Sequence, residues 1–261
     1  PLWMIAVATA FAVIFAKEVF GGTGYNVFNV ALVARAFLFF SYPTKMSGDQ
    51  VWVRTGDSFG MGAGQVIDGY SGATPLGQIG VTEATSFSEV TFTGISGQPL
   101  SISDMFFGFI PGSIGEVSTF AILIGAAILI ITGVGSWKTM LSVFLGGIFT
   151  VLIVNIFAQN AIMEMPPLYH LMLGGFAFGA VFMATDPVTS ARTEKGKWIY
   201  GFLIGLMAVT IRVFNPGYPE GMMLAILFMN AFAPLIDFYV VDANINRRLK
   251  RAVAPTTTNI N

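Results

Sequence analysis

Long apolar segments recur along most of this chain, and they limit what it can fold into more than any other feature. An α-helix that crosses a bilayer needs about 20 mostly apolar residues. Only 10% of the 261 residues are charged, whereas charged residues make up about 25% of an average soluble domain. The sequence therefore predicts an all-helical bundle that crosses a membrane several times. The candidate spans are Leu2–Val19, Phe28–Tyr42, Val117–Val134, Met140–Ala158, Tyr169–Thr185, Trp198–Phe214 and Gly221–Val240.

Two stretches between these spans do not fit a simple crossing. Asp104–Gly115 is apolar but too short to span, and its Gly- and Pro-containing run predicts a half-helix or a re-entrant segment, which needs protein or water to cover its backbone. Thr44–Ser103 is polar, and its alternation at Val90–Thr93 predicts an extramembrane loop with a few short strands. We expect four regions: residues 1–43 with a transmembrane helix and a broken or half helix, the loop 44–103, the transmembrane region 104–240 and the basic tail 241–261.

Positive charges predict how the bundle is oriented, because cytoplasmic connections carry an excess of Lys and Arg. Basic residues gather in the connection Asp186–Lys197, at Lys138 and in the C-terminal tail. Counting spans back from a cytoplasmic tail places all of them on the cytoplasmic side, together with Gly21–Asn29. The loop Thr44–Ser103 then lies outside the cytoplasm.

Residue types exclude several chemistries. The chain has no cysteine, which excludes cysteine-ligated zinc, iron–sulfur clusters and disulfides within it. Redox work here would need an organic cofactor. A net charge of −1 gives no basic field for nucleic acid, so we expect no nucleic-acid partner. The first residue is Pro1, and the apolar run after it lacks the basic flank and cleavage site of a signal peptide, so we interpret it as part of a longer chain.

Seven residues in the predicted loop, Asp68–Thr74, read Asp-Gly-Tyr-Ser-Gly-Ala-Thr. They resemble D-x-x-S/T-G-A-T, the tag on which flavin transferases esterify FMN to a Thr hydroxyl through its phosphate. Thr74 offers a hydroxyl that an enzyme can activate as a nucleophile, and Gly72 and Ala73 leave no bulk beside it. The alternative is a small-residue turn with a capping Thr, and the motif alone leaves both open.

With this tag in an outer loop, the chain resembles the B subunits of the sodium-pumping NADH:quinone oxidoreductases (Nqr). The related D subunits of Rnf complexes share the tag and several stretches. The connection after Thr185 and the basic tail are more similar to Nqr, whose B subunit is longer at its N-terminus. The other stretches that carry the resemblance are Lys17–Gly24, Ala34–Phe40, Gly112–Glu116, Ala184–Val188 and Asn215–Gly221.

The resemblance implies a fold of two related halves, similar to urea transporters. It implies FMN held covalently through a phosphoester to Thr74, with Asp68, Ser71, Gly72 and Ala73 completing the flavinylation motif. A flavin transferase would attach this FMN outside the cytoplasmic membrane of a bacterium, so the resemblance places the loop in the periplasm and agrees with the charge count.

The resemblance also implies a non-covalent riboflavin near Asn26 and Asn29. Amides suit the edge of a flavin ring because each offers two donors and an acceptor. The alternative is helix N-capping, which Asn does well. Electrons would pass from the outer FMN through riboflavin to ubiquinone, coupled to Na⁺ translocation, in an NADH:ubiquinone reductase of six subunits in the bacterial inner membrane.

Asp186, Glu220 and Asp237 lie at the ends of apolar segments. Charges there are costly in lipid and mark ion paths or partner pairs, and carboxylate oxygens suit Na⁺. We therefore predict that these residues couple to sodium. Structural roles are the alternative, because Asp186 precedes Pro187 in a turn and Asp237 can face the basic tail.

Small residues at Gly175-x-x-x-Gly179 and Gly201-x-x-x-Gly205 predict close helix packing. The lone His170 predicts packing rather than metal ligation. Two other functions stay open, which are the D subunit of an Rnf-type ferredoxin:NAD oxidoreductase and a non-redox channel of urea-transporter type. The flavin tag favours a redox protein, because a passive channel has no use for it.

Overall fold

The computed structural model describes residues 1–46, 53–54, 64–65, 74–82, 84–94, 98–113, 115–215 and 221–252. Within them the regular elements are helices apart from β1 (Val53–Arg54), which pairs antiparallel with β2 (Gly64–Gln65). Four helical segments of this described part are long and apolar enough to cross a membrane. They are α1 (Leu2–Ala16) continued by the 3-10 turn η1 (Glu18–Phe20), α7 (Trp137–Ile156), α11 (Glu194–Phe214) and α12 (Met222–Ala252). The predicted polytopic helical bundle is confirmed, and its likeness to urea transporters stays a prediction.

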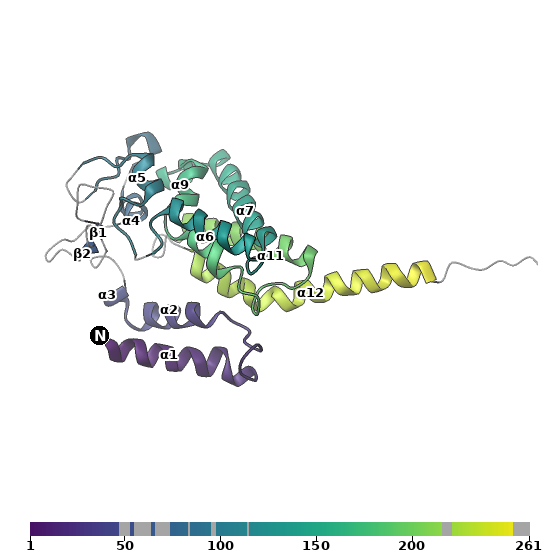
Figure 1. Ribbon diagram of the computed structural model, residues 1–261. Helices are drawn as coiled ribbons and strands as arrows, with labels where there is room; N and C mark the ends of the chain where they lie inside the picture. The colour runs from purple at the N-terminus through teal and green to yellow at the C-terminus, as the bar shows by residue number, and fades with distance from the viewer. Residues whose placement is uncertain are drawn as a thin grey trace, which may run out of the picture.

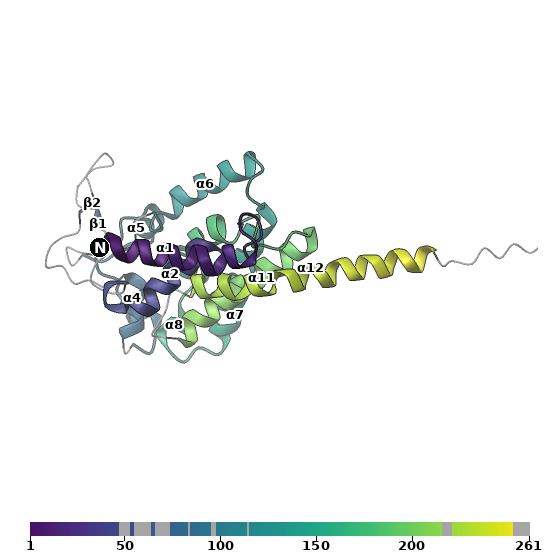
Figure 2. The same cartoon turned by 90° about the horizontal axis from the view of Figure 1, so that it is seen from below.

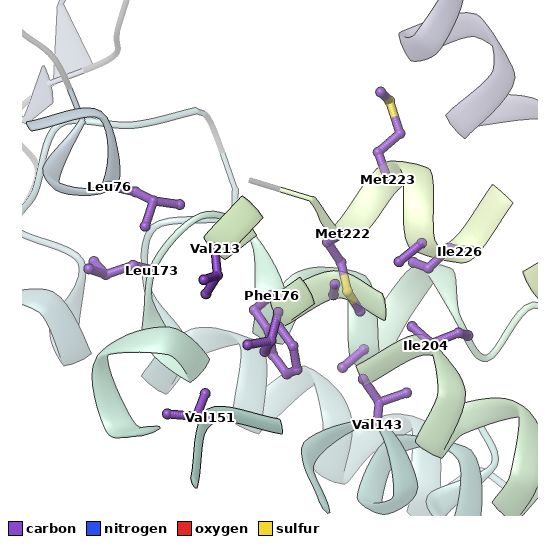
Figure 3. Close-up of a cluster of buried hydrophobic side chains, with 14 of the residues drawn as sticks. Leu76, Val143, Val151, Leu173, Phe176, Ile204, Val213, Met222, Met223 and Ile226 are labelled. Atoms are coloured by element: carbon purple, nitrogen blue, oxygen red, sulfur yellow. The ribbon is translucent and has the colours of Figure 1, made fainter. Parts of the chain in front are cut away.

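Helices α7 and α11 form the most closely packed pair of the bundle. The α-carbon of Gly201 lies so near α7 that an added Cβ would stand 2.7 Å from the carbonyl oxygen of Thr139. At Gly205 an added Cβ would overlap the carbonyl oxygen of Val143. These two glycines therefore act as the spacing predicts, by letting two helix backbones approach. Figure 3 shows Val143 and Ile204 of this pair in the buried core beside Phe176.

The predicted span over residues 169–185 is wrong as a single helix. The chain forms α9 (Pro167–Met172), breaks, and continues as α10 (Phe176–Phe178) and a π-helical turn, η3 (Gly179–Met183). Gly174 and Gly175 make the break, each with φ of +65°, a left-handed conformation that residues with a Cβ rarely adopt. Hydropathy registers only apolar composition, so it could not show this break.

Two further predicted spans are short helices. The span predicted over residues 117–134 contains α6 (Thr119–Ile131), whose 13 residues reach about 20 Å where the bilayer core is about 30 Å thick. The segment over residues 28–42 contains α2 (Val30–Ser41). Within residues 104–115, α5 (Ile102–Phe107) ends at Gly108, which has φ of +86°, and irregular chain leads on to α6.

The helices run between two ends of the bundle, which Figures 1 and 2 show from different sides. The turn between α1 and α2 lies at the end toward which the C-terminal half of α12 projects. The strand pair, α3 (Pro43–Met46) and α4 (Pro75–Val81) lie at the opposite end. Asn29, which precedes α2, and Thr74, which precedes α4, therefore belong to opposite ends.

The described part of the loop at the α4 end packs onto the helices. Leu76 and Ile79 of α4 and Phe92 are buried in the main hydrophobic core. The ring of Phe92 stacks on Tyr169 with centroids 6.0 Å apart. The alternating residues 90–93 do not form a strand. They make only a single bridge, between Thr93 and Pro99.

A carboxylate fastens a second part of this loop. Glu164, at the end of α8 (Ala161–Glu164), accepts hydrogen bonds from the Ser86 hydroxyl at 2.7 Å and the Phe87 N–H at 2.6 Å, beside the 3-10 turn η2 (Phe87–Glu89). These two hydrogen bonds lower the pKa of the exposed Glu164 carboxyl. The ionised side chain thus holds the loop against the membrane helices.

Arg212 of α11 is fully buried and supports the break between α9 and α10. Its guanidinium donates to the carbonyl oxygen of His170 at 2.6 Å and to that of Leu173 at 3.0 Å. These carbonyls stand at the end of α9, where the chain has no next turn to supply N–H partners. The cation therefore satisfies polar backbone that would otherwise be unpaired in the core. His170 is buried beside it, in the packing role expected from the sequence.

We expect Arg212→Met to destabilise the protein by about 2–4 kcal/mol, because two buried carbonyls lose charged donors. The apparent Tm of the detergent-solubilised protein measures this. Arg247→Met removes the same charge from the exposed part of α12 and should leave the Tm unchanged. Equal melting of Arg212→Met and the wild type would contradict the role given to Arg212.

Candidate functional site

Two broken segments meet in the middle of the structure, one between α5 and α6 and the other between α9 and α10. Helix α5 packs against α9, and α6 packs against α10 and η3. At the meeting point the Glu116 carboxylate approaches Gly175 so closely that a Cβ there would lie 2.7 Å from Oε2. A side chain at this position would displace the carboxylate, and the φ of +65° at Gly175 also favours glycine. Irregular backbone is thus enclosed by protein, as it must be at membrane depth.

An ion pair joins this point to α2. Arg35 Nη1 lies 3.8 Å from Glu116 Oε2, and the Glu116 side chain is only 11% exposed. Both charges were visible in the sequence as ionisable groups within or beside apolar segments. The structure pairs them, which is the arrangement that lowers the cost of placing charges there. The pair fixes α2 against the break between α5 and α6.

Three neighbouring cavities follow the broken segment from one end of the bundle toward the other. The first, of about 20 Å³, is lined by Thr74, Glu116, Gly174 and Gly175 among others. The second, of about 140 Å³, shares Gly174 and Gly175 with the first and also contacts Arg35. The third, of about 320 Å³, shares Ala31 and Met183 with the second. Asn29 and Asp186 both line this third cavity.

Thr74 stands at one end of this row. Its hydroxyl oxygen accepts a hydrogen bond from the Gly77 N–H at 3.2 Å and caps α4, so the capping role weighed from the sequence is present. The residue is half-buried. The first cavity has room for about one water, so it does not fit a flavin ring. Asp68, Ser71, Gly72 and Ala73 lie outside the described residues.

Asn29 stands at the other end of the row. Its Oδ1 accepts from the Leu32 N–H at 3.2 Å, so it caps α2, and it is nearly buried. The third cavity lies within the usual size range of ligand pockets, about 300–1,000 Å³, so its size suits a bound flavin ring better than the first cavity does. Asn26 donates weakly to the Phe28 carbonyl at 3.5 Å and does not line this cavity. The structure therefore separates the two asparagines.

Two buried polar residues support Asn29, and the sequence reasoning missed both. With the Asn230 amide oriented so that its oxygen accepts from the Asn29 backbone N–H at 3.0 Å, its nitrogen donates to the Tyr200 hydroxyl at 2.7 Å. Asn230 and Tyr200 come from α12 and α11 and are fully buried. Each of these two residues could have been found in the sequence as a polar residue inside a predicted span, and the same is true of Arg212.

The predicted sodium residues occupy different surroundings. Asp186 accepts from the Val188 N–H at 3.2 Å and the Thr189 hydroxyl at 2.9 Å, in the turn before Pro187, while facing the third cavity. Asp237 accepts from the Arg192 N–H at 2.7 Å and from the N–H and hydroxyl of Thr193 at 3.0 and 2.6 Å. It holds the chain before α11.

Glu220 lies outside the described residues. Within the described part of the chain no three His, Asp or Glu side chains gather as a metal site. A cation there would therefore need main-chain or amide oxygens beside a single carboxylate. Asp186 and Asn29 line the same cavity, where Asp186 supplies a carboxylate and Asn29 an amide oxygen.

Fold and site together define a polytopic helical membrane protein in which two broken segments enclose a row of cavities. Broken helices of this kind mark cofactor or ion sites in membrane proteins. The model of the NQR2, RnfD, RnfE family matches residues 1–246. The chain belongs to this family, which confirms the resemblance found in the sequence.

Curated relatives match along nearly the whole chain, and those described next are B subunits of the Na(+)-translocating NADH-quinone reductase. The relative from Yersinia pestis is 53% identical over 253 residues, 96% of this chain and 57% of the relative. The relative from Klebsiella pneumoniae (strain 342) is 53% identical over 96% of this chain and 58% of its own length. The one from Chromohalobacter salexigens is 51% identical over 98% of this chain and 58% of its own length. The chain thus spans less than three-fifths of the length of these relatives.

Proposed function

We propose that this chain is the flavin-carrying membrane part of a Na⁺-translocating NADH:ubiquinone reductase. FMN would be held by a phosphoester to Thr74, and riboflavin would be held non-covalently beside Asn29. The observation that carries the proposal is that Thr74 and Asn29 stand at the two ends of one row of cavities. Flavins supply electron transfer, and relatives at 51–53% identity bear the name of such an enzyme.

The charge distribution supports an orientation in the bacterial inner membrane. Lys138 and Lys197 lie near the starts of α7 and α11, and Arg192 lies in the chain before α11, all beside a cavity that neighbours the one lined by Asn29. The basic part of α12 projects from the same end of the bundle. The positive-inside rule makes that end cytoplasmic and the Thr74 end periplasmic. A periplasmic flavin transferase could then reach Thr74, and ubiquinone would be reduced toward the cytoplasmic side. The other members of a six-subunit complex would surround the bundle.

The row of cavities alone would also suit a solute channel of urea-transporter type, and the family includes RnfD proteins. Detection of covalent flavin would distinguish the two redox proteins, Nqr and Rnf, from a solute channel. The sodium dependence of quinone reduction then separates the Nqr assignment from the Rnf one.

Thr74→Val should abolish covalent flavin, because it keeps the side-chain shape and removes the hydroxyl. Mass spectrometry of the peptide that contains residue 74, from cells with an active flavin transferase, should show an FMN-minus-water adduct in the wild type only. Thr82→Val is the matched control, because Thr82 is an exposed Thr at the other end of α4. An unmodified wild-type peptide would end the FMN assignment.

Asn29→Ser should lower extractable riboflavin and quinone reduction while Thr74 stays modified. Serine is also a good N-cap, so this change keeps the start of α2 and removes only the amide that faces the third cavity. Asn26→Ser should leave the riboflavin content near the wild-type value, because Asn26 does not line that cavity. Unchanged riboflavin in Asn29→Ser would remove this residue from the site.

Asp186→Asn should raise the sodium concentration needed for half-maximal quinone reduction, with both flavins retained, because it removes charge from the third cavity at nearly constant shape. Asp237→Asn should instead lower the Tm, because an amide nitrogen would face the N–H donors of Arg192 and Thr193. Glu220→Gln belongs in the same sodium titration. Wild-type sodium activation in a fully flavinylated variant would exclude that carboxylate from sodium coupling.

A further inference from the structure

A separate cavity of about 480 Å³ opens at the Asn29 end of the bundle. It lies between the turn that joins α6 to α7 and the chain that leads into α11. It shares Val134, Gly135, Thr185 and Pro187 with the third cavity of the row, so the two cavities are adjacent. Neither flavin nor sodium is assigned to it in the proposed function.

Cations outnumber anions in the lining of this cavity. Lys138, Arg192 and Lys197 contribute to it from three different elements, and Glu194 is the only carboxylate among its lining residues. Glu194 pairs with Lys138 and, at 2.6 Å, with Lys197. Among the described residues no carboxylate forms an ion pair with Arg192. The cavity therefore retains positive charge that can attract an anion.

The surroundings of the cavity are those of a membrane boundary. The rings of Trp137 and Trp198, at the starts of α7 and α11, meet edge to face with centroids 5.9 Å apart. Trp is enriched where the bilayer meets water. Beside the basic groups, Ile131 and Val134 are 84% and 64% exposed. Charge, aromatic rings and exposed apolar side chains thus occur together beside this cavity, and these are the three kinds of group that contact the headgroup, interface and acyl chain of a phospholipid.

We propose that this cavity binds the phosphate headgroup of an anionic phospholipid, whose acyl chains lie along the exposed apolar surface of α6 and α7. Basic pockets between membrane helices recognise such headgroups. Lys138, Arg192 and Lys197 contact the phosphate, and Glu194, which pairs with the two lysines, competes with it for them. A lipid seated here contacts the wall of the third cavity at Thr185 and Pro187. The proposal rests on the membrane fold and is independent of the flavin assignments.

Photoreactive lipids test this directly. The full-length protein, purified with the proteins that accompany it in its complex, is reconstituted with phosphatidylglycerol or phosphatidylcholine that carries a diazirine near the headgroup. Mass spectrometry then measures labelling of residues 136–141 and 192–199. Phosphatidylglycerol should label these residues several-fold more than phosphatidylcholine. Arg192→Gln should lower the phosphatidylglycerol labelling about fivefold, the effect of one basic residue at an anionic surface.

Two controls make the outcome decisive. Lys195→Gln removes the same charge from an exposed residue that does not line the cavity, and it should leave labelling unchanged. Glu194→Gln removes the anion and should increase phosphatidylglycerol labelling, a gain that misfolding would not produce. Equal labelling by the two lipids, no response to Arg192→Gln, or no label at all because another protein of the complex covers the cavity would overturn the proposal. Displacement of the lipid by excess inorganic phosphate would overturn the lipid assignment in favour of free phosphate.

Discussion

The buried guanidinium of Arg212 is the interaction on which the centre of this bundle depends. A helix that ends inside a membrane protein leaves carbonyls without N–H partners, and burying them unpaired is costly. Arg212 supplies donors to the carbonyls of His170 and Leu173. In return, these carbonyls make the burial of the cation tolerable. Because Arg212 belongs to α11, which is closely packed on α7, the most closely packed helix pair of the structure sets where the break between α9 and α10 lies.

The position of that break determines the rest of the site. Gly174 lies against Leu76 of α4 and beside the Arg212 guanidinium, and Gly175 lies against Glu116. One glycine thus positions the helix that Thr74 caps, and the other positions the second broken segment and its ion pair with Arg35. The cavities that run from Thr74 toward Asn29 exist because the chain leaves helical geometry at these two residues. A continuous helix over the same segment would place side chains where the first two cavities now lie.

Apolar segments that form one uninterrupted helix could be predicted well from the sequence. The cores of α1, α7, α11 and α12 follow from apolar runs of membrane length, and the half-helix at α5 was signalled by its Gly and Pro residues. The prediction of one continuous helix over residues 169–185 was wrong because their composition is as apolar as that of a continuous span. Arg212 was visible inside a predicted helix, but its partners are main-chain carbonyls some forty residues away. The pattern of side-chain hydropathy along a sequence does not report where the backbone breaks or which main-chain groups a side chain binds.

Asp186 and Asp237 show the same limit at the level of single residues. Both are Asp residues at the ends of apolar segments, and nothing in the sequence pattern distinguishes one from the other. In the structure the oxygens of Asp237 accept three hydrogen bonds from Arg192 and Thr193, so its charge is already used to order the chain before α11. Asp186 accepts two within its own turn and also faces a cavity beside Asn29. A carboxylate can serve a mobile ion only where neighbouring donors leave its oxygens accessible, and that depends on packing between elements distant in the sequence.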